Sequence, residues 1–283
     1  LHGTKHSFPT RRSSDLSALA WEGGVALAVW SLVAGLRALH TEGRVRTRAL
    51  VAAGVLAGFA LGYRPDLALA LAVVHGWLLW RARGTAAWRP ATIGLLVGLL
   101  PMFVHLAVAG IGPSLRGMFL EPVFDLRPGR ELPSPPSFGR IDGALQAVAE
   151  GPLDAPWWRV PHLSANHQLF LWFFVVVGVA IALPIVAHRR WSKAGRPTGR
   201  RFVLTAAALL GLGMLPQALQ RPDSTHLAWG SCVSFSLLAC LVADIAADRE
   251  VRFRLRPWSV AAATLAATML VVNPFFTYRY YLL

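Results

Sequence analysis

The stretch HQLFLWFFVVVGVAIALPIVAH, which runs from His167 to His188, decides the fold class. It contains no Lys, Arg, Asp or Glu. About 20 consecutive apolar residues, wound into a helix, span the hydrocarbon core of a bilayer and satisfy their own backbone hydrogen bonds there. The stretch is therefore predicted to be a membrane-spanning helix.

Apolar blocks of comparable length recur along the 283 residues, of which 55% are hydrophobic and 15% charged. A soluble domain carries about 25% charged residues. The blocks lack the strict alternation of membrane β-strands. We therefore predict an all-α fold, a polytopic transmembrane helix bundle with about eight spans. The predicted spans are Ser17–Leu39, Ala49–Gly62, Leu67–Trp80, Ala91–Gly110, His167–His188, Phe202–Leu219, Leu227–Ala247 and Ser259–Asn273.

The basic residues give the predicted orientation. Alternate loops, at 40–48, 81–90, 189–201 and 248–257, hold 16 of the 28 Lys and Arg. An excess of Lys and Arg marks cytoplasmic loops, and it accounts for the net charge of +14 without nucleic acid as a partner. The two Arg-Pro-Asp turns and the long proline-rich loop 111–166 are then extracytoplasmic. We expect a multi-pass protein of the bacterial inner (plasma) membrane.

The first sixteen residues, LHGTKHSFPTRRSSDL, do not fit this pattern. They lack the apolar core of a signal peptide, and SFPTRRSSDL resembles the translation of a sequencing-adapter oligonucleotide. We interpret 1–16 as a non-native segment and 17–283 as a single transmembrane domain, the C-terminal part of a longer protein.

Two Arg-Pro-Asp turns carry the candidate binding residues. Tyr63-Arg64-Pro65-Asp66 links two predicted spans, and Gln220-Arg221-Pro222-Asp223-Ser224-Thr225-His226 links two others on the same side. An Arg at the membrane interface suits a phosphate, since its planar fork makes bidentate contacts. The structural alternatives are an Arg–Asp pair closing a tight turn in the first motif, and a helix capped by Asp223 in the second.

Other ionisable residues within the spans are weaker candidates. Glu22 lies near the end of the first span, where an acid is either functional or merely interfacial. His75 and His105 lie within spans, and we expect each to form hydrogen bonds between helices. Pro101, Pro184 and Pro216 are expected to mark kinks. The sequence contains no nucleotide-binding or zinc-protease motif.

The segments LAWEGGVALAVWSLVAGLRAL, LAGFALGYRPDLALAL and LPQALQRPDSTHLAW resemble a group of actinobacterial membrane proteins classed with the GT-C glycosyltransferases. Relatives of that group include protein O-mannosyltransferases and lipid A aminoarabinose transferases. The resemblance covers most of residues 17–283 and is specific in the RPD and RPDSTH turns.

The resemblance implies transfer of a sugar from a polyprenyl-phosphate donor to an acceptor on the extracytoplasmic side. It implies that Arg64 and Arg221 bind the donor phosphate and that His226 or Asp223 orients the phosphate or the acceptor. Asp66 is a further substrate-binding candidate. In this family the acceptor is activated by an acid in a first extracytoplasmic loop. That loop is missing here, which leaves the catalytic residue unassigned and Glu22 as its candidate.

No cofactor and no metal ligand is visible in the sequence, although many GT-C enzymes use a divalent cation. The expected partners are the lipid-linked sugar donor and the bilayer itself. Two other functions stay open at this point: a transporter or flippase for lipid-linked sugars or small solutes, and a membrane scaffold without catalysis. Transporters usually place polar residues near the bilayer midplane, whereas the motifs here lie at helix ends.

Overall fold

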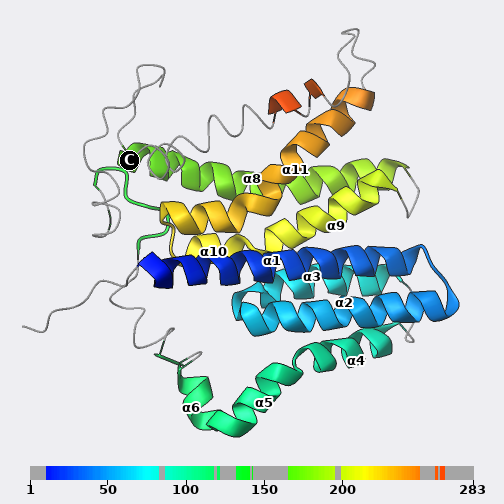
Figure 1. The fold of residues 1–283 in the computed structure, drawn as a ribbon. Helices are drawn as coiled ribbons and strands as arrows, with labels where there is room; N and C mark the ends of the chain where they lie inside the picture. Colours follow the sequence, from blue (N-terminus) through cyan, green and yellow to red (C-terminus); the bar gives the residue numbers. More distant parts are fainter. Residues whose placement is uncertain are drawn as a thin grey trace, which may run out of the picture. The chain divides into compact units, whose positions relative to one another are not determined.

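The computed structural model describes residues 11–82, 87–117, 120–121, 132–140, 142, 165–194, 199–248, 259–260 and 262–264. The chain divides into two compact units, Leu1–Ile111 and Gly112–Leu283. Throughout the described residues the regular structure is helical (Figure 1), as predicted. The first unit holds α1 (Arg11–Leu39), α2 (Gly43–Tyr63), the 3₁₀ turn η1 (Pro65–Leu67), α3 (Ala68–Arg81), α4 (Trp88–Gly98) and α5 (Leu100–Ala109). After the short α6 (Ile111–Leu115), the second unit holds α8 (Ala165–Ala194), α9 (Arg200–Gly213), α10 (Leu215–Gln220) and α11 (Ser224–Asp248).

Within the described residues, five helical segments are long and apolar enough to cross a membrane. They are Trp21–Leu39, Gly43–Tyr63, Leu169–Lys193, Arg200–Gln220 and His226–Ala247. The pair α4 and α5, bent by 44° at its break, makes a sixth if it is counted as one span. These helices indicate a membrane protein.

The remaining predicted spans have different outcomes. The span predicted at Leu67–Trp80 forms α3, whose 14 residues make it shorter than the other candidates. The span predicted at Ser259–Asn273 and most of the loop 111–166 lie outside the described residues. The proposed non-native segment is described only from Arg11, where α1 begins.

The predicted proline kinks fall at helix breaks or inside a helix. Pro101 and Pro216 occupy the first turns of α5 and α10, where their missing N–H groups are tolerated. The bend between α4 and α5 lies beside Pro101. Pro184 lies inside α8, which continues past it.

Glycines bring α2 and α4 into close contact in the first unit. Gly54 and Gly58 of α2 face Gly94 and Gly98 of α4, and a Cβ added at any of the four would lie less than 3.0 Å from backbone of the other helix. Both helices carry the small-xxx-small spacing that lets membrane helices approach closely. The resulting contact of α2 with α4 is as extensive as that of α2 with α1.

In the second unit, α8, α9, α10 and α11 pack around two apolar clusters. One joins α8 to the α10–α11 region through Phe173, Val176, Leu215 and Leu227. The other joins α8, α9 and α11 through Leu183, Leu204 and Leu241. This packing holds the two ends of the QRPD turn, between α10 and α11, in place.

Candidate functional site

The first Arg-Pro-Asp turn is closed by its own ion pair. Arg64 ends α2 in an extended conformation, and Pro65 starts η1. Arg64 Nε donates to Asp66 Oδ1 at 3.0 Å, and Arg64 Nη2 donates to Asp66 Oδ2 at 2.6 Å. The guanidinium fork is thus bound bidentately by the carboxylate two residues on, which is the structural alternative considered for this motif.

Arg64 also packs against α1. A Cβ added at Gly24 would lie 2.8 Å from Arg64 Cγ, so only a glycine leaves room for the arginine stem. Glu22 is two residues before Gly24 on the same helix and is exposed. Residues two apart do not share a helix face. The structure therefore does not bring Glu22 to Arg64, although both belong to the first unit.

The second turn resembles the first in the backbone conformation of its arginine. Arg221 ends α10 with φ −149° and ψ 88°, close to the φ −144° and ψ 91° of Arg64 at the end of α2. In both turns the carbonyl of the Arg accepts a hydrogen bond from a following N–H, that of Leu67 in the first and that of Asp223 in the second. The two turns therefore share the conformation of their arginine but close differently, since the N–H that bonds to the Arg carbonyl is three residues on in the first turn and two residues on in the second.

Asp223 caps α11, as predicted. Its Oδ1 accepts a hydrogen bond of 2.8 Å from the backbone N–H of His226, three residues on. The same oxygen lies 2.8 Å from His226 Nδ1. Because a carboxylate only accepts, Nδ1 carries the proton and Nε2 is the acceptor nitrogen of the neutral ring.

The charge of Asp223 is stabilised within this turn. Burial opposes ionisation and is the largest single influence, but the hydrogen bonds from His226 and the charge of Arg221, with that of His226 when its ring is protonated, together exceed it. The pKa of Asp223 is lowered below its ordinary value as a result. The pair is therefore an ionised carboxylate that orients an imidazole.

Arg221 differs from Arg64 in how its guanidinium is used. Its Nε lies 3.0 Å from Asp223 Oδ2, which makes an ion pair by distance, but the buried Nε–H is not aligned for a hydrogen bond. Its terminal nitrogens have no hydrogen-bond partner in the part of the chain that the structure describes, and the side chain is 26% exposed. Of the two arginines, Arg221 has its fork available for an anion.

The structure thus places the predicted residues in two groups. Arg221, Asp223 and His226 form one site of the second unit, with Trp229 packed against the imidazole at 5.4 Å between ring centroids. Arg64 and Asp66 form a closed pair in the first unit. Chemically, the second-unit site combines an available cation with an oriented imidazole, which suits a phosphate beside a hydroxyl group.

Two polar arrangements lie outside this site, and only the first of them was not predicted from the sequence. Asp244, buried in α11, is bound by Arg190 of α8 at 2.7 Å and by Arg201 of α9 at 3.0 Å. Asp244 stands in an otherwise apolar stretch of the sequence, and this was the signal from which a buried ion pair could have been predicted. The second arrangement joins His75 to Ser31 across two helices, which confirms the expected interhelical role of His75. His105, in contrast, is exposed on α5.

Among the described residues, no three His, Cys, Asp or Glu side chains gather closely enough to hold a metal ion. Comparison with protein families, with characterised proteins and with solved structures finds no match to this chain.

Proposed function

We propose that the chain belongs to a glycosyltransferase that moves a sugar from a polyprenyl-phosphate donor to an acceptor hydroxyl at the extracytoplasmic face of a bacterial plasma membrane. The observation that carries the proposal is the RPDSTH turn, where the available fork of Arg221 lies beside the Asp223–His226 pair. The turn also lies between two helices suited to cross a membrane, which supports a position at the depth of a lipid headgroup.

In the proposed reaction the acceptor oxygen attacks the anomeric carbon of the sugar, and the bond from that carbon to the phosphate oxygen breaks. The acceptor proton passes to His226 Nε2, which is the acceptor nitrogen in the neutral form of the ring whose Nδ1 donates to Asp223. The leaving polyprenyl phosphate gains negative charge, which Arg221 stabilises. Arg64 is the weaker phosphate ligand, because Asp66 already occupies its fork.

A transfer assay tests this proposal. Membranes from cells producing the chain would be supplied with a set of polyprenyl-phosphate hexoses labelled in the sugar, and loss of label from the lipid would be measured. Arg221→Gln should lower transfer at least tenfold, since a charge-assisted hydrogen bond contributes about 1.5–3 kcal/mol. Arg64→Gln should have a smaller effect. Wild-type membranes that transfer no more sugar than membranes lacking the chain would contradict the proposal.

A further inference from the structure

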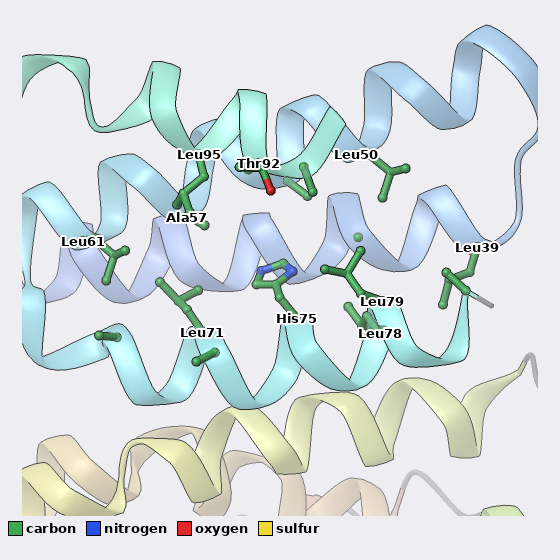
Figure 2. Close-up of a pocket in the computed structure, with 17 residues that line it drawn as sticks. Leu39, Leu50, Ala57, Leu61, Leu71, His75, Leu78, Leu79, Thr92 and Leu95 are labelled. Atoms are coloured by element: carbon green, nitrogen blue, oxygen red, sulfur yellow. The ribbon is translucent and has the colours of Figure 1, made fainter. Parts of the chain in front are cut away.

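The first unit contains an apolar pocket among α1, α2, α3 and α4. Its volume is about 230 Å³. Fifteen of the 17 residues that line it are Leu, Ala or Gly, and the other two are His75 and Thr92. Figure 2 shows His75 near the middle of the pocket, with Leu71, Leu78 and Leu79 beside it on α3.

The hydrogen bonds of Ser31 determine which ring nitrogen of His75 carries the proton. The hydroxyl of Ser31 donates its one proton to the carbonyl of Ala53 at 2.7 Å. The same hydroxyl oxygen lies 2.7 Å from His75 Nε2, so it must accept a proton from that nitrogen. Nε2 is therefore the protonated nitrogen of the neutral ring, and Nδ1 is a hydrogen-bond acceptor.

Nδ1 has no hydrogen-bond partner among the residues that the structure describes. Gly35 of α1 faces Nδ1. A Cβ added at Gly35 would lie 3.7 Å from Nδ1 and 3.0 Å from Leu78 Cδ1. Gly35 itself lines the pocket. The absence of a side chain there leaves the Nδ1 edge of the ring uncovered.

We infer that α3 lies within the bilayer, because it lines this pocket together with the candidate spans Trp21–Leu39 and Gly43–Tyr63, and His75 is near the middle of α3. It follows Asp66 by nine residues and precedes Arg81 by six, which corresponds to about 14 Å and about 9 Å along a helix. The hydrocarbon of a bilayer supplies no water to satisfy a polar group, so an acceptor left unpaired there costs about 1–3 kcal/mol.

We propose that this pocket binds an uncharged lipid alcohol, whose chain packs against the Leu and Ala lining and whose hydroxyl donates to His75 Nδ1. A plain acyl chain would leave Nδ1 unpaired. A charged headgroup would be buried among groups that offer it no counter-ion, since no charged side chain of the described residues lines the pocket. This site lies wholly within the first unit and does not depend on the proposed transferase function.

Photolabelling of the purified chain in nanodiscs tests the proposal. The probe is octadecanol carrying a photoreactive diazirine, and its methyl ether is the matched control, because the ether keeps the chain but loses the donor. Saturable labelling by the alcohol should map to peptides of α2, α3 and α4. The ether should label them about tenfold less, the effect of one hydrogen bond.

Variants of the pocket residues test which side chain makes the pocket prefer the alcohol over its ether. His75→Leu should reduce labelling by the alcohol to the level of the ether, whereas Thr92→Val, which alters the other polar lining residue, should keep the preference. Ala57→Leu should block both probes by filling the pocket, and Ala52→Leu, at an exposed position of the same helix, should block neither. If His75→Leu fails to fold, the wild-type comparison decides alone. Equal labelling by alcohol and ether would overturn the proposal.

Discussion

Replacing Gly58 by alanine tests the close crossing of α2 and α4. A Cβ at this position would lie 2.6 Å from the carbonyl oxygen of Leu95 and 2.8 Å from the Cα of Gly98, both of them backbone atoms. Ordinary van der Waals contact begins at 3.4 Å, so the helices must separate by about 0.8 Å locally. Backbone atoms cannot move aside as a flexible side chain would.

Overpacking of this kind costs about 1–3 kcal/mol, and separating the helices also weakens Cα–H···O contacts of about 0.5–1 kcal/mol each. Against this, alanine is favoured over glycine inside a helix by about 1 kcal/mol. We expect Gly58→Ala to lower the free energy of unfolding by about 1–2 kcal/mol, as measured by titration with SDS in detergent micelles.

Gly62→Ala is the matched control. It is on the same helix, one turn further on, and a Cβ there would meet nothing within 4 Å. This variant should be neutral or stabilised by up to about 1 kcal/mol. Equal unfolding free energies for the two variants would refute the interpretation that α2 and α4 meet through glycines.

Two further predictions concern buried charges. Asp244→Asn should lower the free energy of unfolding by about 3–5 kcal/mol, because it leaves Arg190 and Arg201 without their carboxylate. Asp66→Asn breaks a partly exposed pair and should lower it by about 1 kcal/mol or less in the same SDS titration. Equal effects would contradict the burial argument. Asp223→Ala should cost about 1 kcal/mol at neutral pH through loss of the α11 cap. Because the pKa of Asp223 is lowered in the folded state, its charge stabilises the fold fully above the unfolded-state pKa of about 3.9. This stabilisation is lost as the pH falls through the folded-state pKa. The difference in unfolding free energy between wild type and variant should therefore shrink in acid. A difference that grows in acid would show that Asp223 is not stabilised as a carboxylate.

The long apolar helices could be predicted from the sequence because their signal is local. Span length depends only on consecutive apolar residues, and the α8 span covers most of the predicted stretch. The cap by Asp223 is local as well, since it joins residues three apart. The bend at Pro101 follows from a proline that cannot donate a hydrogen bond.

The long-range contacts could not be predicted in the same way. Asp244 pairs with Arg190, 54 residues earlier in the chain, and no pattern in either helix specifies the other. The glycine contact was within reach, because GVLAG at 54–58 and GLLVG at 94–98 share the small-xxx-small spacing. Such spacing identifies a contact face, but not which helix meets it.

The available fork of Arg221 also required the structure. The two motifs share the residues Arg-Pro-Asp, and the backbone angles of their arginines are nearly the same. The difference lies in side-chain geometry, since Asp66 binds both Nε and Nη2 of Arg64, while Oδ1 of Asp223 accepts from His226 and its Oδ2 forms an ion pair with Nε of Arg221 alone.

Binding of undecaprenyl phosphate to the purified chain tests the central claim most directly. Affinities would be measured in micelles for wild type, Arg221→Gln and Arg140→Gln, the last removing a cation whose side chain is 82% exposed. We predict that Arg221→Gln weakens binding at least tenfold, the effect of a charge-assisted hydrogen bond of about 1.5–3 kcal/mol, and that Arg140→Gln leaves it unchanged. The same affinity for all three proteins would contradict the assignment of Arg221 as the ligand of a lipid phosphate.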